Sequence, residues 1–373
     1  MTSTSTDMIA VAFGGPSPEH DVSILTGLQA SRALHTAGRQ VAALYWSKTG
    51  GWCRVEADTE AASFLDGVPK GAEELRLIVG ENGGFVAEGR LGRSRPLPVA
   101  VVVNCCHGGP GEDGTLQGAF DLAGLRYSGP AVAGAALGMD KLAFGGVVGA
   151  AGLPTLPRRC LDARTLDVGF PGPYIVKPRF GGSSIGVQVV QDVATARHLL
   201  TADPHLREGA VIEPYRPDLF DLNVGVRSWP TLELSAVERP LRADTGGEIL
   251  GYADKYVGSE GMASAPRELP ANIPVALRDA LFEASTVVAG LVSLRGVARV
   301  DFLSDGEVFF VNEVNTIPGS LSRHLWVDPL VPFPALLDGL IDEALSRPTA
   351  RRTTVGADGT VLRAAGGIAA KLA

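Results

Sequence analysis

The stretch that decides the fold is Ala298-Arg-Val-Asp-Phe-Leu-Ser-Asp-Gly-Glu-Val-Phe-Phe-Val-Asn-Glu-Val-Asn315. Its alternation of polar and apolar side chains predicts two strands, near residues 297–303 and 307–315. The Asp305–Gly306 step between them is a hairpin signal. We therefore expect an antiparallel sheet in the last third of the chain.

The polar residues of this hairpin form a candidate metal site. Side chains alternate between the two faces of a strand, so Arg299 shares a face with Asp301, and Glu313 shares one with Asn315. Asn312 is then expected on the other face, without a role. Hard oxygen donors suit Mg²⁺, which shares its remaining positions with substrate phosphates. A solvated hairpin is the competing interpretation, but the opposite faces are apolar and need cover, which favours the magnesium site.

A candidate phosphate site follows an apolar strand in Tyr174-Ile-Val-Lys-Pro-Arg-Phe-Gly-Gly-Ser-Ser-Ile-Gly-Val187. Backbone N–H groups in a loop of small residues can approach phosphate oxygens because no Cβ intrudes. Such a loop can also be a plain hairpin. The chain has only six lysines, however, and Lys141, Lys177 and Lys255 all lie inside candidate motifs. A compact ammonium can contact phosphate as a point charge, so this distribution favours phosphate binding.

The N-terminal part is typical of an α/β lobe. A strand at 9–13, a helix from Ser23 to Ala37 with Ser17 as its N-cap, and a strand at 41–46 form a βαβ unit. This unit predicts a parallel sheet. Weakly patterned residues 49–95 are expected to form short strands and loops. The remaining elements expected here are a strand at 99–106 and a helix at 115–125.

The sequence predicts two further α+β lobes and a flexible tail. The expected division is 1–137, 138–221, 222–346 and 347–373. The second lobe is expected to hold helices at 141–151 and 192–202 and strands at 174–177, 187–190 and 210–213. For the third lobe we expect strands at 222–228, 231–237, 297–303 and 307–315 and helices at 274–294 and 333–346.

Charge and composition exclude several classes of protein. The formal net charge is -8 and no basic run occurs, so a nucleic-acid partner is not expected. No signal-peptide apolar region follows Met1, and no run of about 18 apolar residues occurs, so no membrane partner is expected. The four cysteines include no C-x-x-C pair and are expected to be buried, reduced thiols. We expect a cytoplasmic protein.

One motif points to a different class of enzyme. Gly109-x-Gly111-x-x-Gly114 lies after an expected strand and before an expected helix, as in nicotinamide-cofactor dehydrogenases. Glu112 and Asp113 would, however, bring negative charge where a pyrophosphate should approach. The motif also does not belong to the first βαβ unit. A dehydrogenase is therefore the disfavoured alternative, as is a nucleotide-binding protein without catalysis.

Taken together, the motifs resemble those of the D-alanine–D-alanine ligase family, which has the ATP-grasp fold. The resemblance runs from about Met8 to Ser346. It rests on six motifs in order: Gly14-Gly15-x-Ser17-x-Glu19-x-x-Val22-Ser23, His107-Gly-Gly-Pro-Gly-Glu-Asp-Gly114, Met139-Asp-Lys141, Val176-Lys-Pro followed by Gly182-Ser-Ser-x-Gly-Val187, Lys255-Tyr256, and Arg299-x-Asp301 followed by Asn312-Glu-x-Asn-Thr-x-Pro-Gly319. Each motif is weak alone, but the ordered set is specific.

The resemblance implies ATP and two Mg²⁺ ions, which Mn²⁺ could replace, held by Asp301, Glu313 and Asn315. Lys141 and Lys177 would bind the ATP phosphates, and Lys255 would meet the γ-phosphate. Glu213 would lie on the adenine side. The other residues that the resemblance places at the nucleotide are Ser184 and Asp221.

The resemblance also implies residues for the amino-acid substrates. Glu19 would take the ammonium of the first amino acid, with Ser183 and Tyr256 completing a hydrogen-bonded trio under a lid at 246–270. Arg299 and the Gly319 N–H would stabilise the oxyanion. His107 would line the first-substrate pocket, and His324 and Leu325 would lie at the second. A homodimer and a place in cell-wall peptidoglycan synthesis are also implied.

Two departures from the family pattern bear on the substrates. His324 stands where the family has a serine that receives the carboxylate of the second substrate. In place of the family's glutamate that would hold the ribose, this chain has Asp221, displaced by about one residue. The expected reaction is the ATP-dependent joining of two D-alanines through an acyl phosphate. The alternative that remains is the same mechanism with a different second substrate, for a specialised peptide.

Overall fold

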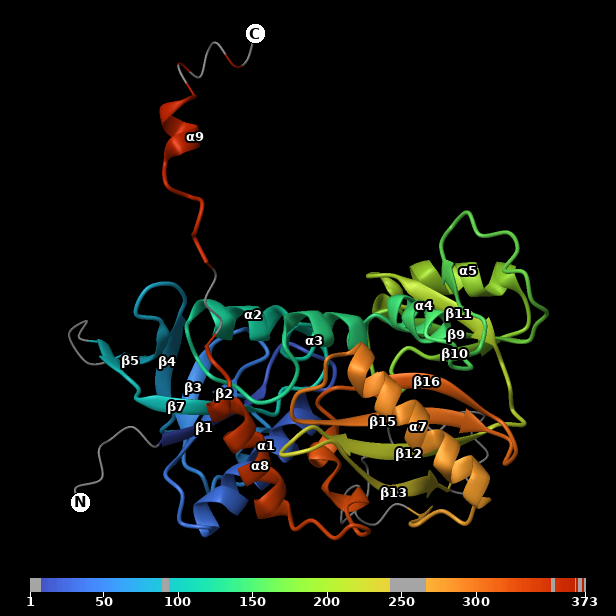
Figure 1. Ribbon diagram of the computed structural model, residues 1–373, viewed down its shortest axis with the longest axis horizontal. Coiled ribbons are helices and arrows are strands. Elements are labelled where there is room, and N and C mark those ends of the chain that lie inside the picture. Colours follow the sequence, from blue (N-terminus) through green and yellow to red (C-terminus); the bar gives the residue numbers. More distant parts are fainter. Residues whose placement is uncertain are drawn as a thin grey trace.

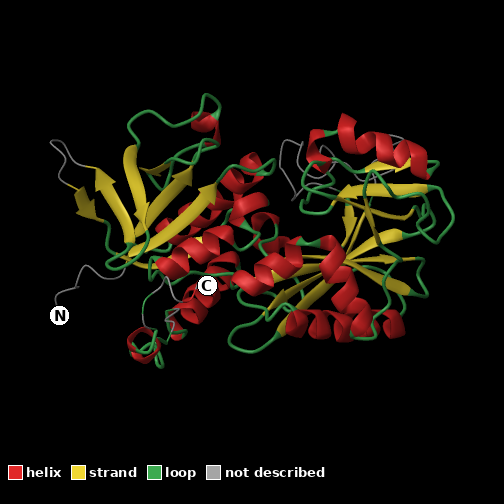
Figure 2. Cartoon of the chain, turned by 90° about the horizontal axis from the view of Figure 1, so that it is seen from above, coloured by secondary structure: helices red, strands yellow, loops and turns green. Residues whose placement is uncertain are grey.

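The computed structural model describes residues 8–88, 94–241, 266–349, 353–365, 367 and 371. The chain forms an N-terminal lobe, a middle lobe and a C-terminal lobe, each built on its own sheet (Figures 1 and 2). Short helix α9 (Thr360–Arg363) projects away from these lobes. Among the described helices none combines the length and the apolar character needed to cross a bilayer.

The N-terminal lobe contains a seven-stranded sheet with the order β6-β5-β4-β3-β2-β1-β7. Strand β1 runs parallel to β2 and to β7, as the βαβ pattern predicted. Strands β3 to β6 are antiparallel, so the prediction of a parallel sheet is wrong for this part, because no α-helical crossover lies between these strands in the described residues. The strands are β1 (Met8–Gly14), β2 (Val41–Trp46), β3 (Trp52–Val55), β4 (Glu73–Ile78), β5 (Gly84–Glu88), β6 (Ser94–Pro96) and β7 (Val99–Asn104).

Helix α1 (His20–Thr36) begins later than its predicted cap at Ser17. Gly14 and Gly15 both have positive φ, and the turn they make ends only at Glu19, the N-cap residue. The Ser17 hydroxyl instead accepts the Glu19 N–H within that turn, at 3.1 Å. The Ser17 cap prediction is therefore wrong, because the turn takes up the residues that would have opened the helix.

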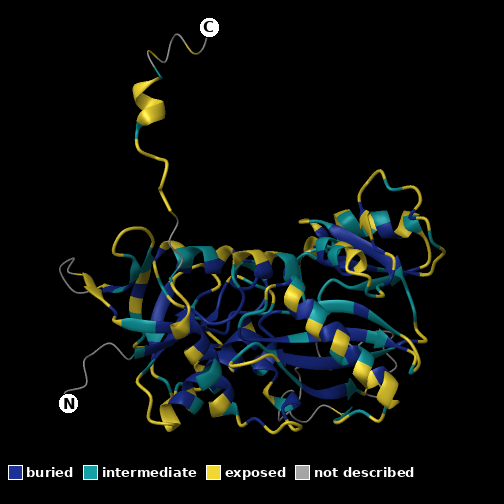
Figure 3. Ribbon diagram, viewed as in Figure 1, coloured by how far each residue is buried: buried dark blue, intermediate teal, exposed yellow. Residues whose placement is uncertain are grey.

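Helix α8 (Phe333–Ser346), although late in the chain, packs on the N-terminal sheet. Its buried residues Leu336, Leu337 and Leu340 share one core with residues of β1 and α1. Strands β1, β2 and β7 of this sheet are mostly buried, whereas α8 also has exposed residues (Figure 3). The 222–346 division thus joins two packing environments. Helices α2 (Thr115–Leu122) and α3 (Val132–Met139) connect to the middle lobe.

The middle lobe is a four-stranded antiparallel sheet, with the order β10-β9-β11-β8. Asp140 caps helix α4 by accepting the N–H groups of Leu142 and Ala143, both at 3.1 Å. Of the four cysteines, three are buried, but Cys160 on β8 is exposed, contrary to prediction. The elements are α4 (Lys141–Ala150), β8 (Arg159–Leu161), β9 (Tyr174–Pro178), β10 (Gln188–Val190), α5 (Val193–Ala202) and β11 (Ala210–Pro214).

The C-terminal lobe is a five-stranded antiparallel sheet, with the order β14-β13-β12-β15-β16. Helix α7 (Val275–Leu291) packs its apolar residues on one face, together with Val224, Val300 and Phe302. The other face carries the polar residues of the site. The strands are β12 (Phe220–Arg227), β13 (Glu233–Pro240), β14 (Arg267–Glu268), β15 (Val297–Ser304) and β16 (Phe309–Asn315), followed by the 3-10 segment η6 (Gly319–Leu325).

Candidate active site

The predicted metal ligands lie together on one face of the C-terminal sheet. Strands β15 and β16 pair so that Asp301 faces Glu313 and Arg299 faces Asn315. The Arg299 guanidinium donates to both oxygens of Asp301, at 2.6 and 2.7 Å, and the Asn315 amide donates to Asp301 at 2.9 Å. The predicted convergence of two carboxylates, an amide and a guanidinium is therefore confirmed.

Asn312 is the residue of this hairpin that the alternation rule misplaced. The register between β15 and β16 shifts after Asp301, so that Asn312 and Glu313 fall within a bulge. The Asn312 amide oxygen accepts a hydrogen bond from Lys177 Nζ at 3.3 Å, on the side of the site. The expectation that Asn312 lies on the other face was wrong, because the extra residue breaks the strand period.

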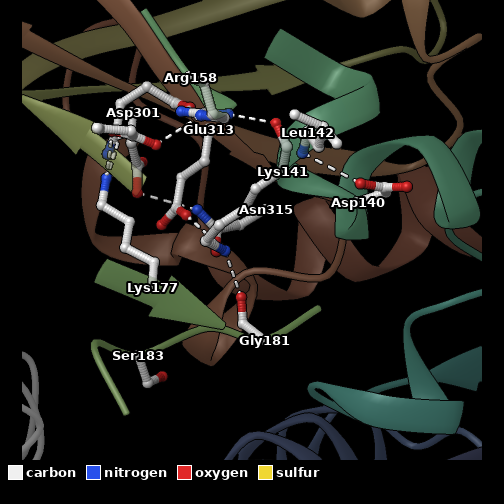
Figure 4. A network of polar contacts seen from close by, with 12 residues as sticks. Asp140, Lys141, Leu142, Arg158, Lys177, Gly181, Ser183, Asp301, Glu313 and Asn315 are labelled. Carbon is white, nitrogen blue, oxygen red and sulfur yellow. Dashed lines mark hydrogen bonds and ion pairs between the residues drawn. The ribbon is translucent and has the colours of Figure 1, made fainter. Parts of the chain in front are cut away.

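Two of the predicted lysines reach this face from the middle lobe (Figure 4). Lys141, at the start of α4, places its Nζ 3.1 Å from Glu313 Oε2 and also donates to the Gly181 carbonyl oxygen. Lys177, on β9, donates to Glu213 Oε2 at 2.9 Å. The two ammonium groups therefore bridge the middle and C-terminal lobes.

Arg158 is a buried residue of the site that the sequence did not indicate. Its Nε donates to Glu213 Oε1 at 2.5 Å, and its two Nη atoms donate to the carbonyl oxygens of Lys141 and Asn312. Burial alone would raise the pKa of Glu213, but the charges of Lys177 and Arg158 outweigh it and lower the pKa. Nothing in the local pattern distinguishes Arg158 from its exposed neighbour Arg159.

These side chains line a cavity between the middle and C-terminal lobes, which we call the central cavity. Its polar residues include most of the predicted nucleotide and metal ligands, and also Asn312, for which no role was predicted. These predicted ligands are Lys141, Lys177, Ser184, Glu213, Asp221, Asp301 and Glu313. Its apolar lining, which the sequence did not indicate, includes Leu156, Ile175, Val187, Leu219 and Leu303. The cavity therefore has both charged and apolar side chains in its lining.

The Gly/Ser loop of the middle lobe meets the N-terminal lobe at Glu19. The Ser183 hydroxyl donates to Glu19 Oε1, as the predicted trio requires. A Cβ at Gly182 would lie only 2.9 Å from Glu19 Oε2, so a side chain at this position would displace the Glu19 carboxylate. The third predicted member, Tyr256, and Lys255 lie outside the described residues, as does most of the predicted lid.

His107 ties the N-terminal lobe to the turn that carries Gly319. Its Nδ1–H donates to the Ile317 carbonyl at 2.6 Å, and its Nε2 accepts from the Thr26 hydroxyl at 2.8 Å. Thr26 in turn accepts the Ser320 N–H at 3.0 Å. Burial lowers the pKa of His107 to about 4, so the ring is neutral at physiological pH. Its predicted contact with the first substrate stays a prediction.

Glu112 makes a second link to the same turn. Its carboxylate accepts the N–H groups of Gly108 and Ile317, both at 3.0 Å, and the Thr316 hydroxyl at 3.3 Å. Burial, together with the neighbouring charge of Glu19, raises its pKa to about 7. From the sequence, Glu112 was considered only as a negative charge that opposes dinucleotide binding, and this structural role was not predicted.

His324 lies near β13, on the face of the C-terminal sheet that carries Arg299 and Asp301. Its Nε2 is 3.3 Å from Glu238 Oε1 on β13. The adjacent Leu325 is fully buried, and its Cδ1 would lie 3.3 Å from a Cβ at Gly225 of β12. Segment η6 therefore covers the face of the sheet that carries Arg299 and Asp301.

The donor chemistry of the hairpin fits a hard divalent cation. Asp301 and Glu313 supply carboxylate oxygens and Asn315 an amide oxygen, and the cations of Arg299 and Lys141 lie beside the two acids. In the described part of the chain no cluster of three or more His, Cys, Asp or Glu side chains is arranged for a metal. The predicted set, with two acids and an amide, is of a different composition.

The central cavity lies between two lobes that each have an antiparallel sheet, and its lining includes two lysines and a pair of carboxylates. This arrangement is typical of a ligase of the ATP-grasp class. Solved structures agree with this fold: D-alanyl-alanine synthetase A from Vibrio cholerae has a TM-score of 0.75 and 21% identity over 92% of this chain and 100% of that one. The VanG D-Ala:D-Ser ligase from Enterococcus faecalis has a TM-score of 0.73 and 25% identity over 91% of this chain and 99% of that one.

The chain belongs to the D-alanine–D-alanine ligase family. Residues 8–130 match the D-ala D-ala ligase N-terminus and residues 156–342 the D-ala D-ala ligase C-terminus. It is 31% identical to the D-alanine–D-alanine ligase of Bradyrhizobium sp. strain BTAi1, over 92% of this chain and 96% of the relative. It is 34% identical to that of Methylobacterium sp. strain 4-46, over 91% of each chain. The protein is therefore an ATP-dependent carboxylate–amine ligase acting on D-amino acids.

Proposed function

We propose that the protein joins two molecules of D-alanine into D-alanyl-D-alanine, with cleavage of ATP to ADP and phosphate. The observation that carries the proposal is the convergence of Asp301 and Glu313 with Lys141 and Lys177 in the lining of the central cavity, with Asn315 bonded to Asp301. Phosphoryl transfer depends mainly on positioning and charge stabilisation, and these side chains supply both.

ATP would occupy the central cavity, whose lining offers apolar side chains to the base and charged side chains to the phosphates. The apolar side chains Ile175, Leu219 and Leu303 suit the flat face of a base, and the two lysines suit the phosphates. Glu213 is engaged by Arg158 and Lys177, so its role would include fixing the phosphate-binding lysine. Two Mg²⁺ ions held by Asp301, Glu313 and Asn315 would neutralise charge on the phosphates.

The chemistry would proceed in two transfers. A carboxylate oxygen of the first D-alanine attacks the γ-phosphorus, the bond to ADP breaks, and an acyl phosphate forms. The amine of the second D-alanine then attacks the acyl carbon, phosphate leaves, and the nitrogen loses a proton. Glu19 would hold the ammonium of the first substrate, while Arg299 and the Gly319 N–H would stabilise the oxyanion.

The second substrate is the part of the proposal with a specific competitor. The structurally similar VanG protein is a D-Ala:D-Ser ligase, and His324 departs from the family pattern at the second-substrate position. A D-amino acid other than D-alanine is therefore the alternative acceptor. We further propose that the reaction is cytoplasmic, because the four free thiols fit a reducing compartment. We also propose that its product feeds peptidoglycan synthesis. The homodimer remains a prediction.

The test is phosphate release with ATP, Mg²⁺ and a panel of D- and L-amino acids, with product masses. Dipeptide from D-alanine alone supports the proposal, release that needs another second amino acid supports the alternative, and no amino-acid-dependent release contradicts both. Glu313→Gln should lower turnover by at least about a hundredfold while the melting temperature is retained. Glu307→Gln, an exposed acid in the same hairpin, is the matched control. Unchanged turnover in Glu313→Gln would refute the metal assignment.

A further inference from the structure

A row of polar side chains crosses four strands of the C-terminal sheet. Glu313, Asp301, Asn223 and Glu238 are successive cross-strand partners on β16, β15, β12 and β13. Directly paired residues point to the same face, so the row faces the central cavity and η6 rather than α7. With strands about 4.8 Å apart, Glu238 lies roughly 10 Å from Asp301 along the sheet.

Glu238 is a buried carboxylate held by three side chains from different elements. It accepts from the Asn223 amide at 3.0 Å and from Arg267 Nη1 at 2.8 Å, and it contacts His324 Nε2 at 3.3 Å. Only 4% of the residue is exposed. Burial alone would raise the pKa of Glu238, but the contacts with His324, Asn223 and Arg267 outweigh it and lower the pKa to about 2. The carboxylate is thus ionised at neutral pH.

The contact with Glu238 determines which part of His324 can meet a substrate. A carboxylate accepts the Nε2–H, which orients the ring and leaves Nδ1 as the nitrogen that can reach a ligand. The Arg267 guanidinium contacts the same carboxylate oxygen, Glu238 Oε1, at 2.8 Å. When the imidazole is protonated the three side chains carry one net positive charge, which suits an anionic ligand group.

We propose that Glu238 is a positioning residue that fixes His324 to bind the α-carboxylate of the acceptor amino acid, so that the pair selects acceptors by that carboxylate. The inference rests on the proposed function. Because the reacting carbonyl would lie at Arg299 on β15, an acceptor whose amine reaches it extends its carboxylate over β12 toward β13. That is where η6 places His324.

Direct binding of a cationic acceptor group by Glu238 is the competing interpretation. The contacts of Glu238 argue against it, since Asn223, Arg267 and His324 together occupy both of its oxygens. A substrate cation would have to displace one of these side chains from a buried position. The structure therefore assigns Glu238 an action through His324 rather than a contact of its own.

The test is a competition between D-alanine and D-alaninamide as acceptors in one reaction. D-alaninamide has no carboxylate and cannot be the donor, so the two dipeptide masses report acceptor choice directly. Glu238→Gln should lower the ratio of D-alanyl-D-alanine to its amide about tenfold or more, with the KM for ATP unchanged. Glu233→Gln is the control, because it removes another acid of β13, one that pairs with Arg227 of β12. It should leave the ratio unchanged.

A double-mutant comparison separates positioning from general damage. His324→Ser should lower the same ratio, and adding Glu238→Gln should lower it little further, because both changes remove one arrangement. Additive effects, or an equal loss of both products in Glu238→Gln, would overturn the inference. A wild-type protein that forms neither dipeptide would instead contradict the proposed function, and the inference with it.

Discussion

His107 and Glu112 are neighbours in sequence that are buried with opposite shifts of pKa. The pKa of His107 falls from 6.5 to about 4, and that of Glu112 rises from 4.5 to about 7. His107 therefore stabilises the fold fully above pH 6.5, and this contribution is lost as the pH falls toward 4. Glu112 does the reverse: its contribution is complete below pH 4.5 and is lost as the pH rises through 7.

The two windows overlap, so each single variant should expose the pH dependence of the other residue. In Glu112→Gln, melting temperature should rise with pH between 4 and 6.5, because the opposing contribution of Glu112 is removed while that of His107 remains. In His107→Gln it should fall between pH 4.5 and 7. Each contribution is on the order of 3 kcal/mol. Thermal unfolding at four pH values checks this, and parallel profiles for the two variants would contradict it.

Single site residues could be predicted from the sequence where strand alternation alone places them. They could not be predicted where contacts between distant segments place them. Asp301, Glu313 and Asn315 could be grouped because strand alternation holds for them. Asn312 could not, because a bulge is set by the pairing of two strands rather than by either one. Arg158 could not either, since its partners come from three segments distant in sequence.

Among the elements, α8 has the packing that its position in the chain predicts least. Its apolar residues complete the core of the N-terminal lobe rather than that of the lobe preceding it. Leu337→Ala should therefore lower the free energy of unfolding by about 2–5 kcal/mol. Leu345→Ala on the same helix, where the residue is 42% exposed, should cost much less.

Thermal unfolding of the two α8 variants measures this difference. Because α8 does not line the central cavity, kcat at 25 °C should be unchanged in both. Equal melting temperatures for Leu337→Ala and Leu345→Ala would show that α8 adds little to the core.

The type and order of the long elements could be predicted from the sequence, and their partners could only partly be. Helices at 275–291 and 333–346 and strands at 220–227 and 297–304 lie within a few residues of prediction, because each has a clear apolar period. The strands of the antiparallel edge of the first sheet are three to six residues long, too short for a period to identify. Helix α3, rich in alanine and glycine, was missed for the same reason.

For the whole molecule, the central cavity predicts that nucleotide stabilises the protein by bridging two lobes. A ligand at a hundred times its Kd adds about 2.7 kcal/mol to the free energy of unfolding. ATP with Mg²⁺ should therefore raise the melting temperature, and EDTA should reduce the shift. Lys177→Ala should remove most of it, because the phosphate contact is lost.

Lys70→Ala, at an exposed position far from the cavity in sequence, is the control for this measurement. Lys177→Ala will itself lower the starting melting temperature, since Glu213 loses one of its two cations. The informative quantity is therefore the nucleotide-induced shift within each variant. A full shift in Lys177→Ala would show that nucleotide binds elsewhere.

The return of α8 to the first sheet has a consequence for biosynthesis. The strands and α1 of that sheet leave the ribosome early, yet the leucines and isoleucine that close their apolar face are encoded near residue 340. Until residues 333–346 are made, this face lacks its native cover. The N-terminal sheet is thus covered only after the strands of the two later sheets have been made, and a chain truncated before 333 lacks part of the core of this lobe.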